Sequence, residues 1–255
     1  MGLFELSLFF AVTALAGAIN SVAGGGTFLT FPVFIMNGLT AYQANIMSTI
    51  ALWPGTITSA YGYKNILNID RKRFTPLLII GLIGGAAGSI TFLKTSDIFF
   101  KQLVPYLLLS ATIIFTFGRN FIALLHKKLP NKPSDKNQYN ILGNIFQLVI
   151  AFYGGYFGAG IGILTLAMLQ LIGFSNIHEM NAIKTILVCA INFVTVIIFI
   201  ISGVVVWNLA AVMIAGGMLG GYVGARIALK IPPNYVRIFV SVIGFSMSLY
   251  FFTRS

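Results

Sequence analysis

Apolar residues occur along this chain in long blocks, not with the short period of an amphipathic helix or strand. Polar or glycine-rich stretches separate ten such blocks, most of which have 17 or more residues and few charges. That length lets a helix cross a bilayer, so the pattern predicts an all-α polytopic membrane protein. The apolar segments are 4–22, 27–37, 42–62, 75–93, 103–125, 141–157, 162–173, 181–202, 208–229 and 235–252.

Two of the segments, 27–37 and 162–173, are too short to span a membrane, and each follows a glycine-rich break. Their 11 and 12 residues would reach only about 17 Å as a helix, roughly half of the hydrocarbon core. We therefore expect the first helix of each half to be broken at glycines. Broken helices in corresponding positions of two halves are typical of secondary transporters, whose substrate site lies between them near the bilayer midplane.

A second glycine pattern shows that the chain is duplicated. Four glycines with the spacing of one helix face recur with an offset of 136 residues. We predict two pseudo-symmetric repeats of about four hydrophobic segments each, 1–125 and 141–255, joined by a flexible cytoplasmic linker, 126–140. The repeated glycines are Gly81, Gly84, Gly85 and Gly88, and Gly217, Gly220, Gly221 and Gly224.

Two membrane topologies fit these segments. In the first, each short segment continues the preceding crossing, which gives eight crossings and parallel repeats. In the second, each short segment returns to its own side as a re-entrant hairpin, so the repeats are inverted and both termini lie outside. The second topology places thirteen of the sixteen Lys and Arg residues on one side, and only Lys94, Lys101 and Arg254 on the other. Because basic loops stay in the cytoplasm, the charge distribution favours inverted repeats.

The composition agrees with a membrane protein. Of the 255 residues, 58% are hydrophobic and 8% are charged, and the mean hydropathy is +0.93; soluble domains carry about 25% charged residues. The formal net charge is +11. Its basic residues lie in short loops between apolar segments, as topology determinants do, so we expect no nucleic-acid partner. The single cysteine, Cys189, excludes an intramolecular disulfide.

The glycine breaks predict an anion-binding site. Backbone outside helical geometry must face protein or an aqueous cavity, and a half-helix that starts there presents free N–H groups and a positive dipole end. The alternative is that the glycines only permit close helix packing. We favour packing for the later, duplicated pattern, but three consecutive glycines point in three directions, so packing alone is not expected to require all of them. The candidate residues are Gly24, Gly25, Gly26, Thr27, Gly158, Gly160 and Gly162.

Polar residues inside later apolar segments extend this predicted site. Lys184 lies about one turn inside an apolar segment, where a cation is costly and indicates a functional site by default. One interpretation is that it neutralises an anionic substrate; the other is that it snorkels to the nearby interface. The further candidates are Asn20, Asn45, Ser48, Asn181 and Thr185.

No catalytic, metal-binding or cofactor-binding constellation occurs. The two histidines, His126 and His178, lie in loops, and no carboxylate lies deep in an apolar segment. The missing acid disfavours a cation substrate and the carboxylate site of a proton- or sodium-coupled transporter. We predict a secondary transporter for a small anion, with no metal or cofactor, and not an enzyme. A passive anion channel with the same lining residues is the alternative.

Several of these motifs together resemble one family. They are the stretch 17–28, Pro32, Gly38 with Leu39, and the stretches 44–49, 154–162 and 181–184. With them the chain resembles the sulfite exporter TauE/SafE family of bacterial permeases over almost its whole length. The resemblance implies a multi-pass protein of the bacterial inner membrane, whose partners are the bilayer and a small anion.

The same resemblance implies a substrate class and site positions. The anion would be a sulfur-containing oxyanion or an organic sulfonate or carboxylate, and the site would include Asn20, both breaks and the segment 181–184. The non-glycine residues Ala159 and Ile161 in the second break depart from the expected pattern. The identity of the anion, the direction of transport, the coupling ion and the oligomeric state are not predicted.

Overall fold

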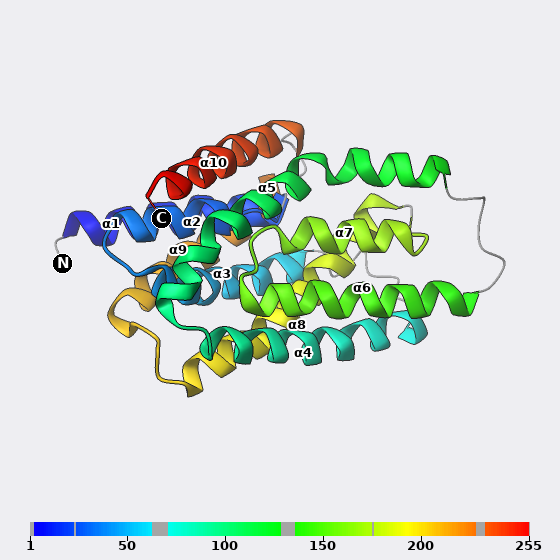
Figure 1. Cartoon of the computed structure of the whole chain (residues 1–255), viewed down its shortest axis with the longest axis horizontal. Helices are drawn as coiled ribbons and strands as arrows, with labels where there is room; N and C mark the ends of the chain where they lie inside the picture. The colour runs from blue at the N-terminus through cyan, green and yellow to red at the C-terminus, as the bar shows by residue number, and fades with distance from the viewer. Residues whose placement is uncertain are drawn as a thin grey trace.

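The computed structural model describes residues 3–22, 24–62, 71–128, 136–174, 176–227 and 233–254. Within these ranges the chain forms helices and no strand (Figure 1). By length and apolar composition, α1, α4, α5, α8 and α9 are suited to cross a membrane, so the predicted all-α polytopic class is confirmed. The helices are α1 (Leu3–Val22), α2 (Thr27–Met36), α3 (Ala41–Gly62), α4 (Arg71–Leu93), α5 (Asp97–Lys128), α6 (Lys136–Tyr156), α7 (Ile161–Leu171), α8 (Ile177–Ile201), α9 (Trp207–Ile227) and α10 (Pro233–Arg254).

Each predicted apolar segment corresponds to one of these helices. The two short segments form the short helices α2 and α7, with 10 and 11 residues. Each follows a long helix, α1 or α6, after a few non-helical residues. The chain order long–short–long–long–long therefore occurs twice, in α1–α5 and in α6–α10.

Helices of one half pack against helices of the other half in a reciprocal pattern. α1 packs against α9, and its counterpart α6 packs against α4, the counterpart of α9. α3 contacts its own counterpart α8, as α5 contacts α10. Figure 1 shows both termini at one end of the bundle, while the end of α5 and the start of α6 lie at the other. Whether the repeats are inverted or parallel in a membrane stays a prediction.

The duplicated glycine pattern forms the seams between these paired helices. On α4, a Cβ atom on Gly84 would lie 2.7 Å from the Cβ of Ala151 in α6. On α9, a Cβ atom on Gly221 would lie 2.7 Å from the Cα of Gly55 in α3, and one on Gly220 would meet the carbonyl oxygen of Ala14 in α1. Real Cβ atoms do not approach other atoms so closely, so the packing function predicted for this pattern is confirmed.

The predicted linker, 126–140, lies partly outside the described residues. α5 extends to Lys128 and α6 begins at Lys136. The structure does not describe residues 129–135 between them. The division into the repeats 1–125 and 141–255 with a linker at 126–140 therefore stays a prediction.

Candidate functional site

The two breaks share an unusual backbone conformation. Gly24 and Gly158, each two residues beyond the end of its long helix, have φ angles of +77° and +78°. Glycine adopts this left-handed region without steric cost. The breaks differ further on, because Gly160 also has a positive φ, +75°, whereas Gly26 has a φ of −58°. Ala23, in the first break, lies outside the described residues.

The breaks meet at a contact between two glycines. A Cβ atom on Gly24 would lie 3.0 Å from the Cα of Gly162, in the first turn of α7, and one on Gly162 would lie 3.1 Å from the Cα of Gly24. The same added atom on Gly162 would lie 3.5 Å from the Cδ of Lys184 in α8. The fold thus brings together candidate residues from three separate segments.

A cavity of about 20 Å³ opens beside this contact, between α1, α3 and α8. It has room for about one water molecule. Five of the residues predicted from the sequence line it: Asn20, Gly24, Gly162, Lys184 and Thr185. The other lining residues are Gly17, Ser21, Gly55, Thr56, Ser59 and Val188.

Lys184 supplies the charge of this cavity. The side chain is 3% exposed, and its Nζ is buried with no hydrogen-bond partner in the described part of the chain. A snorkelling lysine would place its Nζ in water, so this burial contradicts the interface-anchor interpretation. The cavity lining contains no carboxylate among the described residues. A buried ion without a partner is costly, and the described lining offers Lys184 no opposite charge.

Hydroxyl groups from α1 and α3 form a part of the lining that the sequence analysis missed. Ser21 Oγ lies 2.7 Å from Ser59 Oγ and donates a hydrogen bond of 3.0 Å to the carbonyl oxygen of Gly221. Thr56 Oγ1 donates to the carbonyl oxygen of Trp53 at 2.6 Å. In the sequence, Gly17, Ser21 and Gly24 repeat with the spacing of one helix face, and this was the available signal for Ser21.

Two of the three adjacent glycines in the first break lie away from the cavity. A Cβ atom on Gly25 would lie 2.8 Å from Val240 and 2.9 Å from Phe115, and one on Gly26 would meet the carbonyl oxygen of Ala16. Each glycine therefore has its own close neighbour. The nearest neighbours of Gly24 and Gly26 are backbone atoms, whereas those of Gly25 are side-chain ends; the expectation that packing alone does not require all three stays a prediction.

The remaining candidates also lie outside the cavity lining. Asn45 Nδ2 donates a 3.0 Å hydrogen bond to the carbonyl oxygen of Tyr156, at the end of α6. Ser48 Oγ accepts a 2.9 Å bond from Thr30 Oγ1 in α2. Asn45 and Asn181 each keep a buried Oδ1 without a partner in the described residues. A substrate-binding role for these candidates stays a prediction; the set is Gly25, Gly26, Thr27, Asn45, Ser48, Gly158, Gly160 and Asn181.

In the second half, side chains lie close to the counterpart of Asn20. Asn20 lies four residues before Gly24, and Gly154 lies four residues before Gly158, so Gly154 is the counterpart of Asn20. A Cβ atom on Gly154 would meet the Cδ1 of Ile161 and would lie 3.2 Å from the Cγ2 of Ile191. Both isoleucines are buried. Ile161, the departure noted in the sequence, therefore lies against the counterpart of Asn20.

An aromatic cluster packs at the end of the bundle opposite the cavity. It comprises Tyr42, Phe92, Phe100, Tyr156 and Phe199. The Phe92 ring centroid lies 4.5, 4.9, 5.8 and 5.6 Å from those of Tyr42, Phe100, Tyr156 and Phe199, respectively. Tyr42 and Phe199 lie at the start of α3 and the end of α8, whereas the cavity lies toward the end of α3 and the start of α8.

Comparison with known proteins assigns the chain to a family. The family described as Sulfite exporter TauE/SafE matches residues 9–251. The chain is 26% identical to a "Probable membrane transporter protein" of Haemophilus influenzae, over 97% of this chain and 94% of that protein. It is 26% identical to the probable membrane transporter protein YfcA of Escherichia coli K12, over 95% and 88%, and 23% identical to ORF9 of Sinorhizobium, over 96% and 91%. No solved structure matches.

The relatives are described as membrane transporters, and not as enzymes. The described helices include five that are suited to cross a membrane, so the protein is a multi-pass membrane protein with a transport function. Both findings agree with the helical bundle and its cavity at Lys184. The chain belongs to the sulfite exporter TauE/SafE family.

Proposed function

We propose that this protein is a secondary transporter for a small anion, which binds Lys184 at the contact between the two glycine breaks. The observation that carries the proposal is the buried Nζ of Lys184, which has no partner in the described residues and lines a cavity with Gly24 and Gly162. Internal polar cavities between broken helices are where transporters of this type bind their substrates. A cation in such a position is functional by default.

The rest of the lining supports an oxyanion with several acceptor oxygens. Asn20 lies with Lys184 around the cavity, and amide and ammonium groups both donate hydrogen bonds. Thr185 also lines the cavity, but its hydroxyl donates to the carbonyl oxygen of Asn181 at 2.7 Å. The family description names sulfite export, which makes sulfite the first anion to test. Thiosulfate, organic sulfonates and carboxylates share its charge and acceptor groups and form the rest of the panel.

The closed state of the structure supports a carrier over a passive channel. The cavity of about 20 Å³ holds about one water molecule and is too small for an oxyanion of four or more heavy atoms. The aromatic cluster packs at the opposite end, and Ile161 lies against Gly154, the counterpart of Asn20. Substrate entry therefore requires the helices to separate on one side, and release on the other side requires the second half to open.

For the membrane topology we propose re-entrant hairpins α1–α2 and α6–α7 and inverted repeats. The end of α5 and the start of α6 lie at the cytoplasmic side, and both termini lie outside. The support is the thirteen-to-three distribution of basic residues and the position of both termini at one end of the bundle (Figure 1). Basic segments remain in the cytoplasm.

The test is counterflow in proteoliposomes. Purified protein is reconstituted, and the vesicles are loaded with a high concentration of unlabelled sulfite. Uptake of a trace of external radiolabelled sulfite is then followed with the membrane potential held at zero. We expect the label to accumulate transiently above equilibrium, since a carrier exchanges one bound anion for another. Uptake that neither saturates nor shows this overshoot indicates the channel. If no sulfur-containing anion and no carboxylate gives any flux, the proposal is wrong.

A further inference from the structure

A second and larger cavity lies at the end of the bundle where α5 ends and α6 begins. Its volume is about 60 Å³, and α4, α6 and the end of α7 form its walls. It shares no lining residue with the cavity at Lys184. The lining residues are Lys72, Arg73, Pro76, Leu77, Gly143, Asn144, Ile172 and Phe174.

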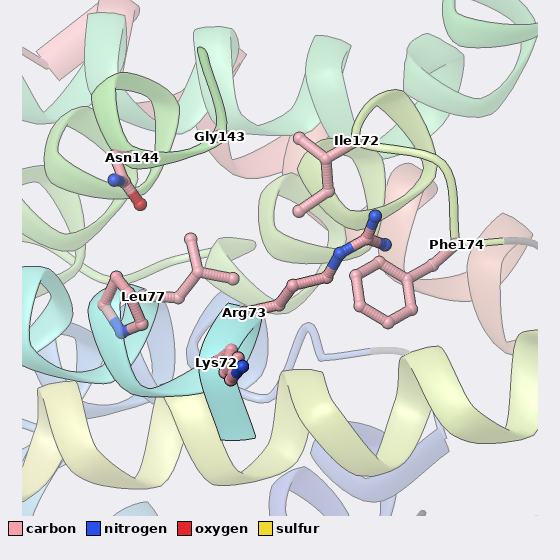
Figure 2. A pocket seen from close by; sticks show the side chains of 8 residues that line it. Lys72, Arg73, Leu77, Gly143, Asn144, Ile172 and Phe174 are labelled. Carbon is pink, nitrogen blue, oxygen red and sulfur yellow. The ribbon is translucent and has the colours of Figure 1, made fainter. Parts of the chain in front are cut away.

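The walls of this cavity combine basic and apolar groups. Figure 2 shows the Arg73 side chain extending from α4 so that its guanidinium lies beside Ile172 and Phe174, while Asn144 lies on the facing helix. Lys72 and Arg73 are both exposed. No carboxylate belongs to the lining among the described residues. The cavity thus combines the positive charge of Lys72 and Arg73 and the amide donors of Asn144 with apolar side chains.

Exposed apolar residues continue from this cavity along the outer faces of α4 and α6. On α4, Ile79 and Ile83 are 51% and 58% exposed, and they follow Lys72 and Pro76 on one helix face. On α6, Leu148 is 45% exposed and lies one turn beyond Asn144. In a membrane-spanning bundle these faces contact acyl chains, so the cavity lies where a phospholipid headgroup meets its chains.

We propose that this cavity binds the phosphate headgroup of an anionic phospholipid. Basic pockets between transmembrane helices on the cytoplasmic side recognise such headgroups. The Arg73 fork matches the geometry of phosphate oxygens. The apolar faces beside Ile79 and Leu148 bind the acyl chains. A soluble anion on its way to Lys184 would gain no binding energy from these apolar faces. The apolar faces therefore favour a lipid as the ligand.

The experiment is native mass spectrometry of the full-length protein in detergent, titrated with phosphatidylglycerol or with phosphatidylcholine of the same chain length. The wild type is expected to bind one phosphatidylglycerol more tightly than the rest, and to show no such preference for phosphatidylcholine. Arg73→Gln should weaken that binding about fivefold, and the double variant Lys72→Gln/Arg73→Gln roughly 25-fold, because each basic side chain near a bilayer surface contributes about 1 kcal/mol.

The matched control is Lys94→Gln, which removes one exposed charge at the opposite end of α4 and should leave phosphatidylglycerol binding unchanged. Equal losses in Lys94→Gln and Arg73→Gln, or none in either, would overturn the proposal. Displacement of the lipid by inorganic phosphate would also overturn it, by showing a site for soluble anions. If Arg73→Gln does not accumulate, Asn144→Leu tests the same cavity without a change of charge, and wild-type binding in that variant counts against the proposal.

Discussion

Lys184→Met is the sharpest test of the proposed substrate site, because methionine keeps the length of the side chain and removes its charge. Two unit charges 4 Å apart at an effective dielectric constant of 20 attract by about 4 kcal/mol. The anion gives up part of its hydration when it binds, which offsets some of that attraction. A net loss of roughly 1.4 to 2.8 kcal/mol remains, so we expect anion affinity to fall about tenfold to hundredfold.

The assay measures anion-dependent melting and proteoliposome uptake on the same preparations. In the wild type, sulfite should raise the melting temperature, since a ligand that binds only the folded state stabilises it. In Lys184→Met this rise should disappear over the same concentration range, and uptake should fall with it. The matched control is Lys94→Met, the same substitution at an exposed position, which should retain both responses.

The stability of the unliganded variant should change in the opposite direction. The wild-type Nζ is buried without a hydrogen-bond partner in the described residues, which costs about 1–3 kcal/mol or more. Methionine removes that cost, so we expect Lys184→Met to melt several degrees higher than the wild type when no anion is present. Wild-type sulfite affinity in this variant would refute the reasoning, and so would a lower melting temperature, which would indicate that the lysine has a structural partner.

Three further predictions follow from the breaks, the aromatic cluster and the topology. Gly24→Ala should abolish transport and destabilise the protein, because Gly24 combines a positive φ with the 3.0 Å approach to Gly162. The control is Gly38→Ala, at a φ of +92° with no neighbour within 4 Å; it should cost about 1–2 kcal/mol and leave specific transport intact. Phe92→Ala should admit a leak of small anions, measured as uncoupled efflux from loaded vesicles; tight vesicles would show that the cluster is only core packing. A cysteine at Ser134 should react with an impermeant reagent only in inside-out vesicles. A phosphatase fused after the last residue should be active. The reverse pattern in these two experiments would contradict inverted repeats.

The positions of the helices could be predicted from the sequence because lipid allows few alternatives. Every spanning backbone must satisfy its hydrogen bonds internally, so an apolar segment of sufficient length becomes a helix. The short helices α2 and α7 were predictable for the same reason, since their lengths cannot cross a bilayer. The pairing of α1 with α9 and of α6 with α4 was not predicted, because each glycine pattern identifies a close-packed face but not the helix that it contacts.

The candidate site was predictable where a residue is costly in a membrane. Lys184 attracted attention as a cation in an apolar segment, and the structure places it on the cavity. Ser21 and Ser59 did not, because a serine in a transmembrane helix can satisfy its hydroxyl on its own backbone. The direction in which Gly25 and Gly26 face could not be derived either, since the turn at Gly24 redirects the chain and fixes which neighbours the next two residues meet.

The two halves differ beside the cavity, and we relate this difference to transport. Two identical halves would place identical cavities on both sides of the membrane, and the bundle would have no preferred closed side. Here Asn20 lines a cavity, whereas its counterpart Gly154 lies against Ile161 and Ile191. A bundle of inverted repeats can exchange these conformations, because each half can adopt the packing of the other. If the second half takes up the open packing of the first, the contact between Ile161 and Gly154 is the one that we expect to change.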